Sequence, residues 1–304
     1  MPRISVITPV YNGSDFIEEC ILSVQEISGI SFEHIIVDDG STDNTREIVS
    51  KYPSIKLLCQ ENKGATAARN YGLNHSVGEY VKFLDADDIL DPTSLKSQYE
   101  YCNSLSVREI SYGYRDVICR DGLSQGFRKR PCELLASSDL VNLILRNIQI
   151  SLPLYPVAAL EEVGGFDESI SGRQEWNLNL RLYSHGWRFV FWDGLTFRQR
   201  FHEGEQRISN RKLFGTNEKL VLDNTYAHIR KLMGKKEKDA WASYTWNIGR
   251  EFLKQGKKKE AKQFFDSAWQ LSSCPTRFLS QKYRIFARVF GPYISEKIIG
   301  LIRR

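Results

Sequence analysis

The feature that most constrains the fold is an alternation of short β-rich runs with amphipathic helical stretches over the first hundred residues. This alternation is typical of βαβ units, whose strands lie parallel in one sheet with helices on its faces. We predict strands at four runs, Ile4–Thr8, His34–Val37, Ile55–Cys59 and Tyr80–Leu84. The sequence therefore predicts an α/β fold with a Rossmann-like, mostly parallel central sheet and flanking helices.

Residue spacing predicts where the helices of this fold lie. Between the first two strands, apolar residues from Phe16 to Val24 fall on one helical face, which would pack on the sheet. Asp91 followed by Pro92 is typical of a helix start, because Asp caps helices and Pro suits the first helical position. Farther along we predict helices over 138–146 and 175–184, and a hairpin of strands 187–192 and 195–201 that turns at Asp193-Gly194.

The last third of the chain differs from the rest in charge and periodicity. The whole chain has a net charge of +5, and residues 211–304 carry 21 Lys and Arg against 8 Asp and Glu, which leaves −8 on residues 1–210. Residues 211–304 are therefore predicted to form a separate basic α-helical region. Within it, positions from Gly249 to Ala268 match one tetratricopeptide-like hairpin, although an ordinary two-helix packing unit is the favoured interpretation.

Cysteine content and hydropathy bear on the compartment. The six cysteines show neither CxxC spacing nor the density of a disulfide scaffold, which favours a reducing compartment and argues against zinc. No apolar run approaches the ~20 residues of a membrane-spanning helix, and the N-terminus is too short and strand-like for a signal segment. We expect a cytoplasmic protein.

Polar and aromatic residues follow three of the predicted strands. In an open α/β sheet, ligands bind beyond the carboxyl ends of the strands, so these residues are expected to converge on one ligand site. They are Pro9-Val10-Tyr11-Asn12-Gly13, Asp38-Asp39-Gly40-Ser41-Thr42-Asp43 and Asp85-Ala86-Asp87-Asp88.

Asp85 and Asp87 form an Asp-x-Asp pair at the end of an apolar strand. In an extended segment both carboxylates point to the same side, where they would offer hard oxygen ligands to Mg²⁺ or Mn²⁺. Such an ion could hold a diphosphate. The alternative is an Asp-rich turn that caps a strand, which is common in proteins.

Three further residues describe a nucleotide pocket. Asp39 can accept a hydrogen bond from a nucleobase, Tyr11 offers a ring for stacking, and Arg69 can pair with a base or a phosphate. Taken singly, each has a simpler alternative: a turn Asp that caps a helix, a core Tyr, and an Arg paired with a surface carboxylate. Their joint placement favours the pocket.

The order and spacing of these motifs resemble those of a known family. Alongside the segments after the strands, the chain contains Asn62-Lys63-Gly64-Ala65-Thr66-Ala67-Ala68-Arg69-Asn70-Tyr71-Gly72, and downstream Gly164–Glu168 and Gln174–Arg181. Over about residues 1–210 the chain resembles a family 2 glycosyltransferase, of the inverting, nucleotide-sugar-dependent kind with a GT-A fold. The resemblance implies a nucleotide-sugar-binding half at 1–100 and an acceptor-side half at 101–210.

The resemblance also implies a role for each candidate site residue. Pro9, Tyr11 and Asp39 would hold the base, Arg69 would support the nucleotide, Asp85 would face the ribose and the metal, Asp87 would be the main metal ligand, and His202 would reach the metal or the diphosphate. Glu175 would be the catalytic base. It stands where the family usually has the Asp of a Glu-Asp-Trp run, so this carboxylate is one methylene longer.

The implied activity is transfer of a hexosyl or N-acetylhexosaminyl group from a nucleoside diphosphate donor, with UDP favoured, to a hydroxyl of a glycan or lipid-linked acceptor. Mn²⁺ or Mg²⁺ would assist, and the product would belong to cell-surface polysaccharide or lipopolysaccharide. The alternatives are a catalytically inactive scaffold and, with less support, a nucleotidyl transferase.

The basic region at 211–304 could place the protein on the inner face of the cell membrane by contacting anionic lipids. A solvated helical face is an equal alternative. Nucleic acid is not an expected partner, because no aromatic and basic residues interleave as nucleic-acid-binding surfaces require.

Overall fold

The computed structural model describes residues 2–119, 139–201 and 217–302. The chain divides into two compact units, one of Met1–Ser138 with Ile148–Arg211 and one of Asp139–Asn147 with Lys212–Arg304. Residues 139–147, predicted within the acceptor-side half, belong instead to the helical unit.

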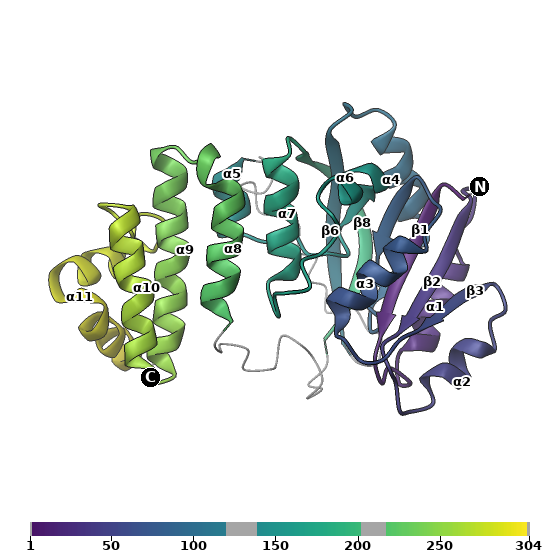
Figure 1. Ribbon diagram of the computed structural model, residues 1–304, viewed down its shortest axis with the longest axis horizontal. Helices are drawn as coiled ribbons and strands as arrows, with labels where there is room; N and C mark the ends of the chain where they lie inside the picture. Colours follow the sequence, from purple (N-terminus) through teal and green to yellow (C-terminus); the bar gives the residue numbers. More distant parts are fainter. Residues whose placement is uncertain (1, 120–138, 202–216, 303–304) are drawn as a thin grey trace. The chain divides into compact units, whose positions relative to one another are not determined.

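The first unit is built on a sheet of eight strands in the order β3-β2-β1-β4-β7-β6-β8-β5 (Figure 1). The pairs β3-β2, β2-β1, β1-β4 and β6-β8 are parallel, whereas β7 runs antiparallel to both its neighbours and β5 runs antiparallel to β8. The strands are β1 Ile4–Val10, β2 Phe32–Asp38, β3 Ile55–Cys59, β4 Tyr80–Phe83, β5 Ile89–Leu90, β6 Glu109–Ile118, β7 Pro153–Pro156 and β8 Arg188–Arg200. The predicted mostly parallel sheet is confirmed, and the first four strands lie within two residues of their predicted bounds.

Helices of this unit connect the strands and cover the sheet (Figure 1). They are α1 Ile17–Gln25, α2 Thr45–Ser50, α3 Ala65–Asn74, α4 Ser94–Cys102, α6 Val157–Glu162 and α7 Gln174–Ser184. The predicted apolar face of α1 is buried. Helix α3 packs against β1 and β2. This close approach requires Gly72, because a Cβ there would lie 2.5 Å from Cγ2 of Ile7.

The predicted hairpin at Asp193-Gly194 is wrong, because β8 continues through it as one strand. The pairing of β8 with β6 explains the difference. Residues 192–194 lie opposite the single residue Gly113, which makes an irregularity in the ladder instead of a turn. A Cβ on Gly113 would lie 2.3 Å from the carbonyl oxygen of Gly194, so this local shape depends on both glycines.

The second unit is helical, as predicted for the C-terminal region. It consists of α5 Leu140–Leu145, α8 Glu218–Ile229, the 3₁₀ helix η2 Arg230–Leu232, α9 Lys235–Lys254, α10 Lys258–Leu271 and α11 Gln281–Ile302. The antiparallel pair α9 and α10 forms its centre, with Trp246 and Phe265 packed at a ring separation of 4.6 Å. Within the described ranges, no helix combines the length and the apolar character needed to cross a membrane.

A charged side chain lies in the core of the first unit. Lys82, in the middle of β4, has no exposed surface, and its Nζ donates to Oε1 of Gln98 at 3.3 Å and to the carbonyl of Leu152 at 3.2 Å. Burial lowers the pKa of Lys82 to about 7, because the charged form loses its hydration.

Lys82 is therefore expected to make stability depend on pH. Because its pKa is lower in the folded state, the unfolded chain binds the additional proton between about pH 7 and pH 10. The free energy of unfolding should rise with pH across this window, by up to ~1.4 kcal/mol per pH unit. Urea unfolding of the wild type and of Lys82→Met at several pH values measures this. The wild-type profile should be the steeper, and parallel profiles would contradict the assignment.

Candidate active site

A cavity of about 520 Å³ opens in the first unit, beyond the carboxyl ends of β1, β2 and β4. Its lining includes seven of the eight predicted site residues: Pro9, Tyr11, Asp39, Arg69, Asp85, Asp87 and Glu175. The eighth, His202, lies outside the described residues. Residues more than a hundred positions apart in the sequence therefore converge on one cavity.

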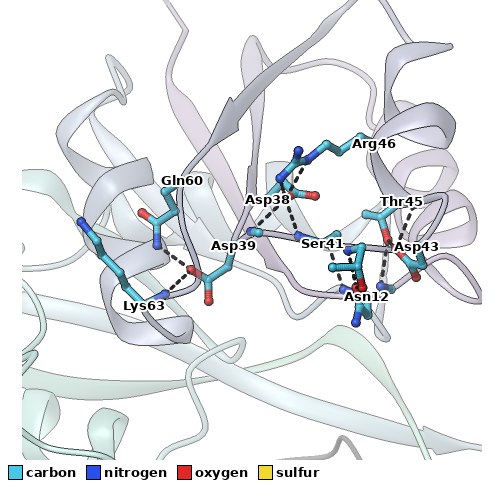
Figure 2. Close-up of polar contacts among 12 residues, drawn as sticks. Asn12, Asp38, Asp39, Ser41, Asp43, Thr45, Arg46, Gln60 and Lys63 are labelled. Atoms are coloured by element: carbon cyan, nitrogen blue, oxygen red, sulfur yellow. Dashed lines mark hydrogen bonds and ion pairs between the residues drawn. The ribbon is translucent and has the colours of Figure 1, made fainter.

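The loop after β2 is held by its own side chains (Figure 2). Oδ1 of the buried Asp38 accepts from the backbone N–H groups of Gly40 at 3.0 Å and Ser41 at 2.8 Å, and also from Arg46. The loop after β1 joins it, since the N–H of Asn12 donates to Oγ of Ser41 at 2.9 Å and Oδ1 of Asn12 accepts from the N–H of Thr42 at 2.8 Å. The two loops thus form one bonded edge of the cavity.

Asp39 links this edge to the start of α3 (Figure 2). Its Oδ1 accepts from Nε2 of Gln60 at 2.7 Å and from the N–H of Lys63 at 2.8 Å, and its Oδ2 accepts from the N–H of Gly64 at 2.8 Å. Asp39 therefore has, in part, the structural role that was the alternative to nucleotide binding. A carboxylate offers about four acceptor positions, so one remains for a ligand N–H.

Two features of this edge suit a nucleotide. The Tyr11 side chain is 41% exposed at the cavity, so its ring is free to stack on a base and is not a core ring. Helix α3 starts at the cavity, directly after Gly64, whose φ of 90° lies in the region that favours glycine. The N–H groups and the dipole at this helix start favour a negatively charged group such as a phosphate.

Three carboxylates gather after β4. Asp85, Asp87 and Asp88 each place one oxygen within 4.8 Å of the others. Asp88 is buried, and its Oδ1 accepts from the backbone N–H of Arg200 at 3.0 Å. Sequence reasoning left Asp88 out of the ligand set, although it follows Asp87 directly. The donor set of hard oxygens fits Mg²⁺ or Mn²⁺.

The negative potential of this cluster reaches the thiol of Cys20, on the buried face of α1. Burial is the first cause that raises the pKa of Cys20, and the charge of Asp88 is the second, with smaller contributions from Asp87 and Asp85. A cation beside the three carboxylates would relieve their mutual repulsion, which supports the fit of a divalent ion.

Arg69 connects the carboxylate cluster to α7. The side chain is buried; its Nη2 donates to Oδ1 of Asp85 at 2.7 Å and its Nη1 to Oε1 of Gln174 at 3.4 Å. The guanidinium also lies over the ring of Phe166, 5.7 Å from its centroid. Through these contacts Arg69 holds Asp85 and Gln174 in position. The sequence predicted a nucleotide contact for Arg69 but not this positioning role.

Glu175 lines the same cavity from the first turn of α7. The chain reaches this turn through two residues with positive φ, Gly172 at 119° and Arg173 at 52°. Glu175 does not pair with Arg181 of the same helix, because the Arg181 guanidinium donates to the carbonyl groups of Gly165 and Val163. The half-buried Glu175 carboxylate therefore faces the cavity and is not paired with Arg181.

Sequence reasoning missed Arg200. Its side chain is 1% exposed at the end of β8, forms an ion pair with Glu19 and donates from Nε to the carbonyl of Asp87 at 3.3 Å. Backbone and side chain of Arg200 thus both contact the acidic segment after β4. The sequence feature that could have indicated Arg200 is its place near the end of the predicted strand 195–201.

The sheet, the cavity at its carboxyl edge and the carboxylate cluster are those expected of the GT-A fold. Residues 5–119 match the family model described as glycosyl transferase family 2. The chain thus contains a family 2 glycosyltransferase domain, as the motifs predict.

Relatives and solved structures agree with this. The chain is 31% identical over 216 residues to the uncharacterized glycosyltransferase RC0461 of Rickettsia conorii, covering 68% of this chain and 36% of that protein. It is 41% identical over 126 residues to TuaG of Bacillus subtilis, named as a teichuronic acid biosynthesis glycosyltransferase, covering 40% of this chain and 50% of TuaG. The matched part thus spans between about a third and a half of these relatives.

The fold is similar to that of residues 1–349 of S. aureus TarS, solved in complex with UDP-GlcNAc. The TM-score is 0.76 at 21% identity, and the match covers 99% of this chain and 91% of that one. This likeness shows the shared fold, including a helical region after the GT-A unit.

Metal binding at the three carboxylates is expected to stabilise the folded protein. At a Mn²⁺ concentration near 100 times Kd, mass action adds about 2.7 kcal/mol, which corresponds to roughly 5–10 °C in Tm. Asp87→Asn should lose most of this shift, and without metal it should be at least as stable as the wild type, because like charges are removed. Thermal unfolding with and without Mn²⁺ measures both effects.

The matched control is Asp266→Asn, which removes an exposed carboxylate paired with Lys262 on α10. It should keep the full Mn²⁺ shift. An equal shift in Asp87→Asn would exclude this cluster as the metal site.

Proposed function

We propose that the chain is an inverting glycosyltransferase that moves a sugar from a nucleoside diphosphate donor to a hydroxyl group of an acceptor. One observation carries the proposal: Asp85, Asp87 and Glu175 line a single cavity. Inverting transfer needs a group that stabilises the departing diphosphate and another that accepts the acceptor's proton. The cavity contains candidates for both.

The donor would bind along the edge formed by the loops after β1 and β2. Tyr11 and Pro9 would contact the base, the remaining acceptor position of Asp39 would take a base N–H, and the start of α3 would favour the phosphates. TarS binds UDP-GlcNAc and UDP, and it shares this fold. We therefore favour a UDP-sugar, with a hexosyl or N-acetylhexosaminyl group.

Asp85 and Asp87, with Asp88 beside them, would hold Mn²⁺ or Mg²⁺. When bound, the ion supplies positive charge that stabilises the leaving diphosphate. Arg69 would keep the Asp85 carboxylate in place through its 2.7 Å ion pair. His202 remains a predicted further contact to the metal or the diphosphate.

Glu175 would act as the general base. Its carboxylate takes the proton of the acceptor hydroxyl while the hydroxyl oxygen forms a bond to the anomeric carbon. The bond from that carbon to the diphosphate breaks, and its electron pair leaves with the nucleoside diphosphate. Because the hydroxyl oxygen attacks from the face opposite the departing diphosphate, the configuration at the anomeric carbon inverts, and no covalent enzyme intermediate forms.

The acceptor would be a glycan or a lipid-linked saccharide of a cell-surface polysaccharide or lipopolysaccharide. The similarity to TuaG, named for teichuronic acid biosynthesis, supports this class. Such acceptors are assembled at the membrane, so we place the protein in the cytoplasm, on the inner face of the cell membrane. An inactive scaffold is the less favoured alternative, because it would give no role to Asp85, Asp87 and Glu175, which line one cavity.

Replacing the proposed base tests the mechanism. A general base contributes about 10²- to 10⁴-fold, so Glu175→Gln should lose that much in kcat. Nucleotide binding should be kept, because the amide preserves size and the donor edge is untouched. The assay is release of free nucleoside diphosphate from a panel of nucleotide sugars with Mn²⁺ or Mg²⁺.

Glu100→Gln is the matched control, since Glu100 is an exposed carboxylate on α4 that lies 3.7 Å from Lys96. It should turn over like the wild type. Unchanged kcat in Glu175→Gln would remove Glu175 from the role, and no turnover by the wild type with any sugar would favour the scaffold.

A further inference from the structure

Helix α11 leaves apolar side chains in contact with solvent. Ile285 is 59% exposed and Val289 is 65% exposed, and they lie four residues apart on one helical face. Beyond the break at Gly291, Ile294 is a further exposed apolar residue, at 50%. We call Ile285 and Val289 the α11 stripe.

The opposite side of α11 is fixed against α9. Tyr283 and Ala287 are buried, and the Tyr283 hydroxyl accepts from Nε1 of Trp246 at 3.2 Å. The guanidinium of Arg250, also on α9, lies 3.9 Å from the centroid of the Tyr283 ring. Because these contacts fix the rotation of the helix, the stripe faces outward within this unit.

Cations border the stripe on both sides. At 100° per residue, Arg284 and Arg288 follow one edge of the Ile285 and Val289 face, and Lys282 lies at the other. All three are exposed. Residues 267–295 contain four Lys and Arg and no Asp or Glu. The next acidic residue, Glu296, forms an ion pair with Arg250.

We propose that the α11 stripe docks in the plane of an anionic lipid bilayer. Apolar residues bordered by cations on both sides match such a surface, because the apolar side chains enter the headgroup boundary while Lys and Arg reach the lipid phosphates. This docking deepens the proposed function, on which its purpose rests, since it would bring the cavity to a lipid-linked acceptor. The docking itself needs no donor, metal or acceptor.

Sedimentation of the full chain with vesicles tests the docking. The wild type should bind vesicles that contain phosphatidylglycerol, bind pure phosphatidylcholine weakly, and be released from the former by high salt. The double variant Ile285→Ser/Val289→Ser should bind at least about 10-fold more weakly. Arg284→Gln/Arg288→Gln should lose about fivefold for each cation.

Two matched controls keep the test specific. Val107→Ser changes a valine that is 92% exposed in the other unit, and Lys235→Gln/Lys236→Gln removes two exposed cations at the start of α9. Both should bind vesicles like the wild type. Far-ultraviolet circular dichroism and Tm establish that each variant is folded, and the arginine variant tests the proposal by itself if the serine variant is not.

Three results would overturn the docking: wild type that does not sediment with anionic vesicles, stripe variants that bind equally well, or a dimer in solution that Ile285→Ser/Val289→Ser dissociates. The last would assign the stripe to a second copy of the chain. The Mn²⁺ shift in Tm and nucleoside diphosphate release should be unchanged in the stripe variants. If the wild type bound anionic vesicles but showed neither a Mn²⁺ shift in Tm nor nucleoside diphosphate release, the proposed function would be contradicted and the docking would not.

Discussion

The contact of the buried Arg69 side chain with Asp85 is the constraint on which the rest of the cavity depends. Arg69 comes from α3, Asp85 follows β4, and Gln174 opens α7, so one guanidinium joins three elements. A buried charge is tolerated when it is paired and hydrogen-bonded, and both Nη atoms of Arg69 are bonded, one to Asp85 of the acidic cluster and the other to Gln174 beside Glu175. The same guanidinium therefore contacts both sides of the cavity.

The acidic loops divide structural and binding work between adjacent residues. Asp38 accepts hydrogen bonds from its own loop, and Asp39 accepts three hydrogen bonds from the segment that leads to α3. A loop bonded in this way loses little freedom when a ligand arrives, which favours tight binding. The Asp-rich sequence is therefore needed for the shape of the edge as well as for its chemistry.

Much of this could be predicted from local patterns. Apolar runs between turn residues located β1 to β4 within two residues, and the rule on strand ends brought Pro9, Asp39 and Asp87 to one edge. The features that local patterns did not predict depend on partners distant in sequence. Asp193-Gly194 has the composition of a turn, but pairing with β6 keeps it in a strand. The structural role of Arg69 and the contacts of Arg200 depend on residues distant in sequence, which no spacing reveals.

The raised pKa of Cys20 has a practical consequence. A thiol reacts as its thiolate, and burial together with the neighbouring carboxylates keeps Cys20 protonated. Cys59, in contrast, is exposed at the end of β3. Alkylating reagents and mild oxidants should thus spare the Cys20 thiol and react instead with the exposed Cys59.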